Sequence, residues 1–360
     1  MNVTMRTLLL ALAMLGVLLA PPGEAHAQPG RMGINGLTVG DDGSVPSRAA
    51  IQALARAGAA WVRVEFKTGP FGGTDSAAFY QAYDELVDGY RAEGVQVLGL
   101  VDNVTLPGDP GQWQDNAYET TGGNGNNDYL RGLATMSARI AAHFQGRMSH
   151  LEVWNEPNAP NTYLHPSNFA ALLTETYAMT KIYNQIDVQL VSGGLHAHSL
   201  YGLNCDSAGA AYLRQTYAAG IATGTFLWAR ERIGGWPLDV IGQHPYLRHD
   251  GWLSAGEMHY YLDCLHQAYA EQGDGWKPIW ATEFGWRSDY VGESVQAANI
   301  RTAFAAFHDS PYVQNALLFT HVDFFEPYGI WYGWCNLADP GAEPGCRKPE
   351  PYAAFTESVD

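Results

Sequence analysis

The segment Leu151-Glu152-Val153-Trp154-Asn155-Glu156-Pro157-Asn158 is a short, largely apolar run that ends in an acidic residue and a proline. Proline has no backbone N–H to give to a strand ladder, so the pattern predicts a strand over Leu151–Asn155 that stops at Pro157. A second segment, Pro278-Ile279-Trp280-Ala281-Thr282-Glu283-Phe284-Gly285-Trp286, has the same form, with a strand over Ile279–Glu283 that ends at Gly285. Nearly continuous apolar runs are typical of parallel strands that are covered on both faces. The two segments therefore favour a parallel sheet between layers of helices.

Six further strand-like runs alternate with amphipathic helical patterns along the chain. We predict the strands at Gly33–Leu37, Ala60–Phe66, Val95–Val101, Gln189–Ser192, Asp239–Gln243 and Ala316–His321. We predict the helices at Ser47–Arg56, Asp75–Glu93, Tyr129–Phe144, Asn168–Ile186, Ala255–Glu271 and Val295–Phe307. Eight strand–helix repeats of about 40 residues predict an α/β fold, a single-domain (β/α)8 TIM barrel. A doubly wound sheet would need a glycine-rich phosphate turn, and Gly33-Ile34-Asn35-Gly36 does not provide one.

The composition indicates a large folded domain. Apolar residues make up 46% of the 360 residues, which excludes a disordered chain. The formal net charge of −17 argues against nucleic acid as a partner. The 11 tryptophans and 20 tyrosines exceed what a core requires, and such rings often stack on flat ligands such as sugars.

The first 27 residues have the features of a secretion signal. Arg6 precedes an apolar run from Leu8 to Ala20, and the small-residue site Ala25-His26-Ala27 follows. A membrane anchor is the alternative, but this run is too short to span ~30 Å of hydrocarbon. We therefore expect residues 1–27 to be removed. Residues 28–360 would then form one catalytic domain, secreted to the periplasm or the medium, monomeric and without a membrane partner.

Four cysteines suit an oxidising compartment, where an even number suggests disulfides. Cys335 and Cys346 bracket a loop rich in proline and glycine and are our first choice for one bridge. Cys205 would then pair with Cys264, although the other pairings remain open. A zinc site is the competing interpretation, but no C-x-x-C spacing supports it.

Two glutamates, Glu156 and Glu283, lie at the ends of the fourth and seventh predicted strands. In an eight-stranded barrel these strand ends face each other across the mouth, where active sites lie. Two carboxyl groups there can flank a glycosidic bond, one giving a proton while the other attacks the anomeric carbon. The alternative is structural, with Glu156 at a helix start and Glu283 paired with a nearby arginine. The joint position of the two residues beside aromatic side chains favours the catalytic interpretation.

The Asn-Glu-Pro motif at 155–157 and the later Thr-Glu-Phe-Gly segment at 282–285 resemble clan A glycoside hydrolases. These are retaining (β/α)8 enzymes that include families 5 and 39, and the resemblance covers most of the chain after residue 27. It implies that Glu156 is the acid/base and that Glu283 is the nucleophile. It also implies that Asn155 binds the 2-hydroxyl of the sugar.

Three further residues match the clan less strongly. Arg63 resembles the strand-two arginine beside the nucleophile, where its charge would keep Glu283 ionised. A peripheral ion pair with Glu65 is the alternative for Arg63. His244 and Tyr246, in Gln243-His244-Pro245-Tyr246, resemble the strand-six histidine and tyrosine of the clan. The tyrosine would orient the nucleophile, and the histidine would contact the acid/base or the substrate unless it is simply a buried, hydrogen-bonded histidine.

The aromatic residues around the predicted mouth are expected to hold sugar. Many clan members carry a tryptophan at the end of strand eight, where this chain has Leu318-Phe319-Thr320-His321. The 24-residue segment from Val104 to Asn127 follows the third strand and is expected to wall the cleft, with a surface loop as the alternative. The aromatic sugar contacts that we expect are Trp113, Trp286, Trp331, Trp334 and His321.

The predicted function is that of a secreted retaining glycoside hydrolase that cleaves β-linked polysaccharides or oligosaccharides by double displacement, without a cofactor or metal. The mechanism needs a protonated Glu156, so we expect its pKa to be raised by burial against Trp154 or by the charge of Glu283. The identity of the sugar, endo or exo action and transglycosylation remain open.

Two other classes of function compete with this prediction. A metal-dependent barrel hydrolase would use His196, His198, His244 and Asp323 as ligands. A non-catalytic barrel would use the aromatic walls for carbohydrate binding alone.

Overall fold

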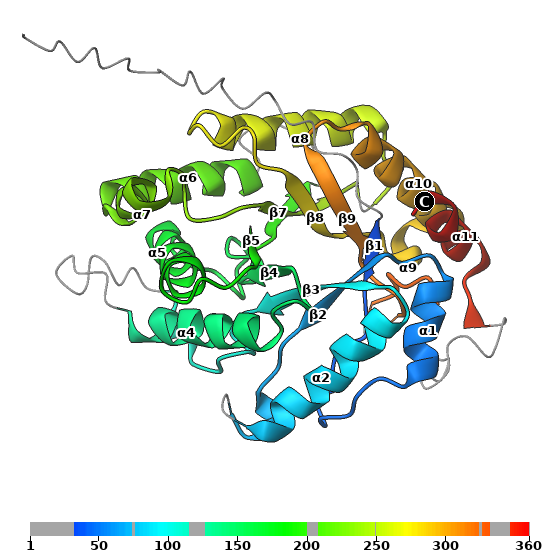
Figure 1. Ribbon diagram of the computed structural model, residues 1–360. Coiled ribbons are helices and arrows are strands. Elements are labelled where there is room, and N and C mark those ends of the chain that lie inside the picture. The colour runs from blue at the N-terminus through cyan, green and yellow to red at the C-terminus, as the bar shows by residue number, and fades with distance from the viewer. Residues whose placement is uncertain are drawn as a thin grey trace, which may run out of the picture.

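The computed structural model describes residues 32–73, 76–114, 127–199, 208–248, 250–323, 326–331 and 346–359. Within these residues a curled, wholly parallel sheet lies inside a layer of helices (Figure 1). The strands follow the order β5-β4-β3-β2-β1-β9-β8-β7-β6. Their bounds are β1 (Gly33–Asn35), β2 (Trp61–Glu65), β3 (Gln96–Val101), β4 (His150–Val153), β5 (Gln189–Ser192), β6 (Leu195–Ser199), β7 (Ile241–Leu247), β8 (Ile279–Phe284) and β9 (Val313–Leu318). This architecture confirms the predicted (β/α)8 fold.

The described residues contain nine strand segments rather than eight because the fifth strand is broken at Gly193-Gly194. β5 pairs with β4, whereas β6 pairs with β7. Ser192 N donates to Val240 O at 3.0 Å, which joins β5 to the residue just before β7. A Cβ on Gly194 would overlap the imidazole of His244, so only glycine allows this close approach. The break thus brings the chain after β5 against the centre of the barrel.

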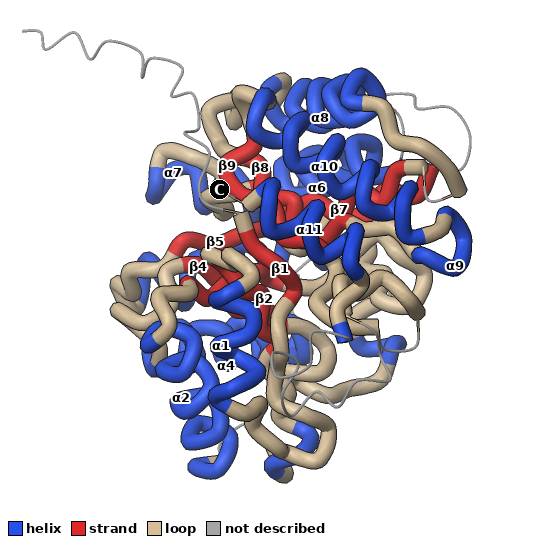
Figure 2. The backbone as a smooth tube through the Cα atoms, turned by 90° about the vertical axis from the view of Figure 1, so that its right-hand side faces the viewer, coloured by secondary structure: helices blue, strands red, loops and turns tan. Residues whose placement is uncertain are grey.

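The helices surround the sheet, as the tube view shows (Figure 2). Their bounds are α1 (Arg48–Arg56), α2 (Ala77–Ala92), α4 (Asp128–His143), α5 (Pro166–Tyr177), α6 (Ala208–Ala222), α7 (Thr225–Ile233), α8 (Ala255–Ala270), α9 (Ser288–Val291), α10 (Glu293–Asp309) and α11 (Pro349–Ser358). The short 3₁₀ helices η1 and η2 cover Gly69–Phe71 and Pro110–Gln112, and the π-helix η3 covers Ala178–Tyr183. Side-chain caps begin several of the helices, including Ser47 at α1 and Ser254 at α8.

The strand and helix predictions differ from the structure mainly at the ends of the elements. β7 continues through Pro245, whose strand partner in β6 is Ala197, so the strand predicted to end at Gln243 is longer than expected. The predicted helix Asn168–Ile186 is α5 followed by the π-helix. α6 and α7 were not predicted, because the Ala- and Gly-rich sequence of α6 lacks a clear apolar stripe.

Aromatic side chains fill the barrel at the amino-terminal ends of β2, β4 and β8. This aromatic floor consists of Trp61, His150 and Trp280. Trp280 packs on Trp61 with 4.9 Å between ring centroids and stacks on His150 at 4.2 Å. Side chains two residues apart on a strand share a face. Two residues further along the same strands, Arg63, Glu152 and Thr282 therefore form a polar layer above this floor.

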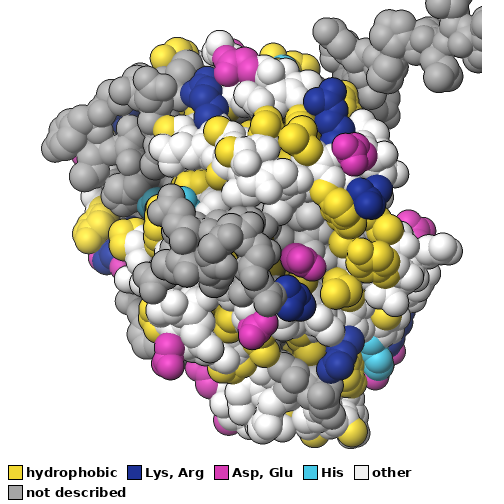
Figure 3. Space-filling view, turned by 90° about the vertical axis from the view of Figure 1, so that its left-hand side faces the viewer, with side chains coloured by type: hydrophobic (Ala, Val, Ile, Leu, Met, Phe, Trp, Pro, Cys, Tyr) yellow, Lys and Arg dark blue, Asp and Glu magenta, His cyan; other side chains and the backbone are white. Residues whose placement is uncertain are grey.

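The predictions for export, domain extent and disulfides remain predictions. Residues 1–27, Cys205 and Cys335 lie outside the described residues, and neither Cys264 nor Cys346 is a free thiol. No helix in the described part of the chain is long and apolar enough to cross a bilayer. On the face in Figure 3 the basic side chains stand apart from one another among acidic and apolar ones.

Candidate active site

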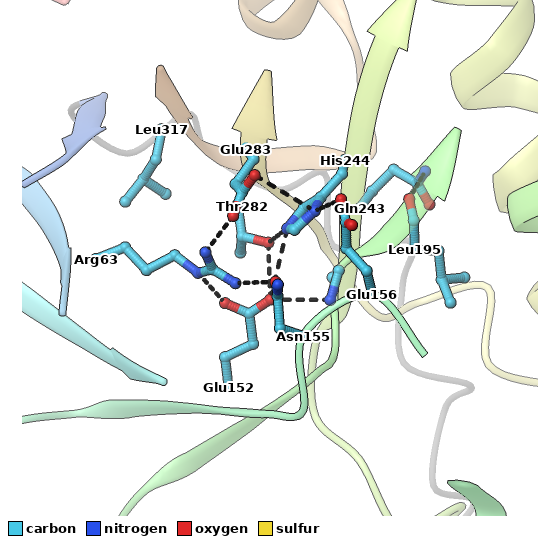
Figure 4. Close-up of polar contacts among 12 residues, drawn as sticks. Arg63, Glu152, Asn155, Glu156, Leu195, Gln243, His244, Thr282, Glu283 and Leu317 are labelled. Carbon is cyan, nitrogen blue, oxygen red and sulfur yellow. Dashed lines mark hydrogen bonds and ion pairs between the residues drawn. The ribbon is translucent and has the colours of Figure 1, made fainter. Parts of the chain in front are cut away.

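A strained turn after β4 presents Asn155 and Glu156. Trp154 and Glu156 have φ angles of 77° and 46°. This left-handed conformation is unfavourable for residues other than glycine and persists only where the surroundings enforce it. The ring of Trp154 is fully buried and its Nε1 donates to Thr162 O at 2.7 Å, while Thr162 Oγ1 donates to Glu156 O at 2.8 Å. These contacts hold the turn so that both polar side chains join the cluster in Figure 4.

Glu283 lies near the end of β8 and its carboxylate has two donors. Tyr246 Oη donates to Oε2 at 2.7 Å, and Arg63 Nη1 donates to Oε1. Burial and the neighbouring charge of Glu283 raise the pKa of Tyr246 well above its usual value, so the hydroxyl keeps the proton that it donates. The structure thus places Arg63 and Tyr246 beside Glu283.

Arg63 connects several groups of the site. Its Nε donates to Glu152 Oε2 at 2.6 Å and its Nη2 donates to Asn155 Oδ1 at 2.9 Å. Burial alone would lower the pKa of Arg63, but the charges of Glu152 and Glu283 hold it above its usual value. The predicted alternative, a peripheral pair with Glu65, is wrong: the ion pairs of Arg63 are with Glu152 and Glu283.

Two imidazoles contact Glu156. His196 Nδ1 and His244 Nδ1 each lie 2.9 Å from Glu156 Oε1. Burial acts to raise the pKa of Glu156, but the hydrogen bonds from the two histidines outweigh it and hold this pKa well below its usual value. Burial lowers the pKa of His196, and the contact with Glu156 more than offsets this and raises it. The expected rise in the pKa of Glu156 is therefore wrong, because the hydrogen bonds from the two histidines favour the ionised carboxylate more than burial disfavours it.

The side chains of Glu156 and Glu283 both lie close to the imidazole of His244. One oxygen each of Glu156 and Glu283 and one nitrogen of His244 all lie within 4.8 Å of one another. His244 Nδ1 is 3.7 Å from Glu283 Oε2. Three groups of this kind can in principle share a cation, but here each is already hydrogen-bonded or ion-paired within the protein.

The ligand set of the alternative metal hydrolase is not gathered by the described residues. His196 and His244 meet at Glu156, whereas Asp323 Oδ1 accepts from Lys348 Nζ at 2.8 Å and from Gly329 N at 2.7 Å. The side chain of His198 lies outside the described residues.

A cleft of about 1060 Å³ opens beside Glu283. This volume lies at the upper end of the range of ligand-binding clefts, about 300–1,000 Å³. Its inner end is formed by Arg63, Asn155 and Glu283, and the loop after β1 and the end of β2 form its walls. The residues that line it are Asn35 to Asp41, Ser44 to Ser47, Arg63, Glu65, Lys67, Leu100, Asn155, Glu283, Phe319, Thr320 and Glu326.

Phe319 is the aromatic residue that lines this cleft at the end of β9. Its half-buried ring packs edge-on against Tyr328 and Tyr246, with centroid distances of 5.5 and 6.4 Å. Phe319 lies two residues before His321, one of the residues that we expected to contact sugar. A buried carboxyl, that of Asp102, lies next to Glu65, which lines the cleft. Burial and the charge of Glu65 raise the pKa of the Asp102 carboxyl to about 8.

Four predicted sugar contacts are core residues instead. Trp286 is 0% exposed and its Nε1 donates to Leu247 O, and Trp331 and His321 are each 1% exposed. Trp113, at 3% exposure, packs against Trp154 and Tyr129. The prediction that these rings stack on substrate is wrong, since a buried ring offers no face to a ligand. Trp334 and residues 115–126 of the expected cleft wall lie outside the described residues.

Three polar residues of the site were not predicted from the sequence. Glu152 and Thr282 lie on inward-facing strand positions, and His196 was considered only as a metal ligand. A signal was present for Glu152, because a charged residue inside the apolar run Leu151–Val153 needs a buried partner.

Comparison with known proteins supports the fold alone. No family model matches the chain, and no curated protein matches it. A family 128 (subgroup II) endo-β-1,3-glucanase from Sorangium cellulosum is 20% identical, with a TM-score of 0.52 over 90% of this chain and 98% of its own. A broad-specificity family 5 endoglucanase from Clostridium longisporum is 12% identical, with a TM-score of 0.63 over 91% and 96%. A family 39 glycoside hydrolase from Bacteroides cellulosilyticus is 18% identical, with a TM-score of 0.60 over 93% and 64%.

The chain has the fold of these clan A hydrolases. The resemblance inferred from the Asn-Glu-Pro and Thr-Glu-Phe-Gly segments is thereby confirmed at the level of the fold.

Proposed function

We propose that this protein is a retaining glycoside hydrolase that cleaves β-linked glucans by double displacement. The observation that carries the proposal is the close approach of two carboxylates: one oxygen each of Glu156 and Glu283 lies within 4.8 Å of the other. Retaining enzymes hold their carboxyl groups about 5–5.5 Å apart, whereas inverting enzymes leave about 6.5–9.5 Å for a water molecule.

The roles of the two residues follow from their partners. Glu283 is fixed by Arg63 and Tyr246, which keep a carboxylate oriented towards an anomeric carbon. Glu156 contacts two histidines that can hold and return a proton. Glu283 attacks the anomeric carbon, the glycosidic C–O bond breaks, and Glu156 gives its proton to the leaving oxygen. Glu156 then takes a proton from water, which attacks the glycosyl ester and frees Glu283.

The substrate class is proposed from the cleft and the structural neighbours. The cleft beside Glu283 has room for several sugar units, and Asn155 would meet the 2-hydroxyl of the reacting sugar. One neighbour, a family 128 (subgroup I) endo-β-1,3-glucanase from Amycolatopsis mediterranei, was solved in complex with laminaritriose. It is 16% identical to this chain with a TM-score of 0.52. β-1,3-Glucan oligosaccharides are therefore the first substrates to test.

The deciding experiment is to follow the anomeric configuration of the first product by proton NMR. A panel of β-linked polysaccharides with product sizing first identifies the substrate. Release of the β-anomer supports the proposal, and release of the α-anomer refutes it. Glu283→Ala separates catalysis from binding: lost hydrolysis with retained binding is expected, whereas unchanged hydrolysis would exclude Glu283 as the nucleophile.

We also propose that residues 1–27 are removed on export and that the mature chain is a monomer. The charged start, short apolar run and Ala25-His26-Ala27 site support the first part. Intact mass measurement of the exported protein under oxidising conditions tests the cleavage site, and peptide mapping without reduction tests the pairs Cys205–Cys264 and Cys335–Cys346.

A further inference from the structure

Glu152 is a buried carboxylate that the proposed reaction does not use directly. Its side chain is 0% exposed, and it lies on β4 four residues before Glu156. Three groups from other parts of the barrel donate to it: Arg63 Nε to Oε2 at 2.6 Å, and Gly194 N and Thr282 Oγ1 to Oε1, each at 2.9 Å. An ionised carboxylate buried this completely persists only where such donors compensate it.

Two chains of contacts lead from Glu152 to the two proposed catalytic carboxylates (Figure 4). Through Arg63 it reaches Glu283. Through Thr282 it reaches His244, because Thr282 Oγ1 lies 3.0 Å from His244 Nε2, and His244 Nδ1 lies 2.9 Å from Glu156 Oε1.

The second series of contacts, from Glu152 through Thr282 to His244, determines which nitrogen of His244 carries a hydrogen. A carboxylate only accepts, so the single hydroxyl proton of Thr282 points at Glu152. Thr282 Oγ1 can then only accept from its other neighbour, so His244 Nε2 carries a hydrogen. With Nε2 protonated, a proton between His244 Nδ1 and Glu156 can pass to the carboxylate and leave a neutral imidazole.

The opposite arrangement would block this transfer. If His244 Nε2 carried no hydrogen, its Nδ1 hydrogen would belong to a neutral ring, and loss of that hydrogen would leave an imidazolate. Such a ring donates to Glu156 but gives up no proton at working pH. The tautomer of His244 therefore decides whether this ring, which contacts Glu156 together with His196, can return a proton to Glu156.

We propose that Glu152 is a positioning residue that, through Thr282, fixes His244 in the tautomer with hydrogen on Nε2 and so keeps a transferable proton between His244 and Glu156. This inference rests on the proposed function. In the first step the proton passes to Glu156 and from Glu156 to the leaving oxygen, and His244 ends neutral. In the second step the attacking water returns the proton to the same pair.

Thr282 offers the sharpest test because valine has the same shape without the hydroxyl. Thr282→Val should lower kcat/KM on an unactivated oligosaccharide by about 10²-fold, the scale of lost general acid catalysis. On a dinitrophenyl glycoside, whose leaving group needs no proton, kcat/KM should stay within about threefold of the parent. Thr282→Ser keeps the hydroxyl and should show both rates close to those of the parent.

Controls separate this role from a general loss of structure. Thr216→Val removes another buried threonine hydroxyl, which donates to Tyr212 O at 3.0 Å on α6, and should leave both rates unchanged. Glu152→Gln should lose the oligosaccharide rate like Thr282→Val and also lose part of the dinitrophenyl rate, because Arg63 beside Glu283 is disturbed as well.

The tautomer can also be measured without turnover. Nitrogen NMR of labelled protein should show His244 Nε2 protonated in the parent and in Thr282→Ser, and unprotonated in Thr282→Val. The inference is overturned if Thr282→Val lowers both rates equally, lowers neither, or leaves the nitrogen spectrum of His244 unchanged. If the parent protein hydrolyses no glycoside at all, the proposed function fails, whereas the nitrogen spectrum still decides the tautomer.

Discussion

Replacement of Tyr246 by phenylalanine removes a single atom next to the proposed nucleophile. Tyr246 is 7% exposed, and its hydroxyl is 2.7 Å from Glu283 Oε2. Without it, the nearest remaining donor that the structure records for this oxygen is His244 Nδ1 at 3.7 Å, which is too long for a hydrogen bond. A hydrogen bond to a charged group contributes about 1.5–3 kcal/mol. At about 1.4 kcal/mol for each factor of ten, Tyr246→Phe should lower kcat/KM by about 10-fold to 150-fold.

The assay is steady-state hydrolysis of a β-glucan oligosaccharide, together with chemical unfolding of the same samples. Tyr217→Phe is the matched control, because the Tyr217 hydroxyl donates to the buried carboxylate of Asp274. The control should lose stability but keep its kcat/KM. Equal losses of activity in the two variants, or none in Tyr246→Phe, would refute the argument that this hydroxyl orients Glu283.

Four further outcomes are expected. Glu156→Gln should lower kcat/KM on oligosaccharides by about 10²–10⁴-fold and much less on dinitrophenyl glycosides, and equal losses on both would contradict an acid role. Phe319→Ala removes the aromatic ring of the cleft and should raise KM by about tenfold with little change in kcat, which initial-rate kinetics measures. Burial lowers the pKa of His321 from 6.5 to about 4, so as the pH falls His321 is protonated in the unfolded chain before it is protonated in the folded protein. The free energy of unfolding therefore keeps the whole contribution of neutral His321 above pH 6.5 and falls by up to about 3 kcal/mol towards pH 4. Urea unfolding of His321→Gln should show a shallower loss over this range. Turnover should be unchanged by EDTA, and loss of activity that zinc restores would favour a metal hydrolase.

The positions of the two glutamates could be predicted because they depend on local pattern. A short apolar run stopped by Pro157 or by Gly285 marks a strand end, and the carboxyl ends of parallel strands share one rim. Arg63, Asn155, His244 and Tyr246 followed from a family resemblance, and the structure places each of them at the same rim.

The aromatic residues show where this reasoning fails. Trp286 and Phe319 both follow a strand end, yet Trp286 is fully buried and Phe319 lines the cleft. The sequence shows that a residue is aromatic, but it does not show whether the backbone directs its side chain into the core or into the cleft. The prediction that the pKa of Glu156 is raised was wrong for a related reason. His196 and His244 come from two different strands and contact the same oxygen of Glu156 only in the folded barrel.

The amino-acid sequence by itself determined the alternation of strands and helices and the two acidic strand ends, because both depend on neighbours within a few residues. Tertiary structure alone decided which side chains of distant strands meet. Glu152, Arg63 and Thr282 stand on three separate strands, and barrel closure makes their contacts. Hydrogen bonds act over about 3 Å, so the partners of a buried charge become known only when the fold has set those distances.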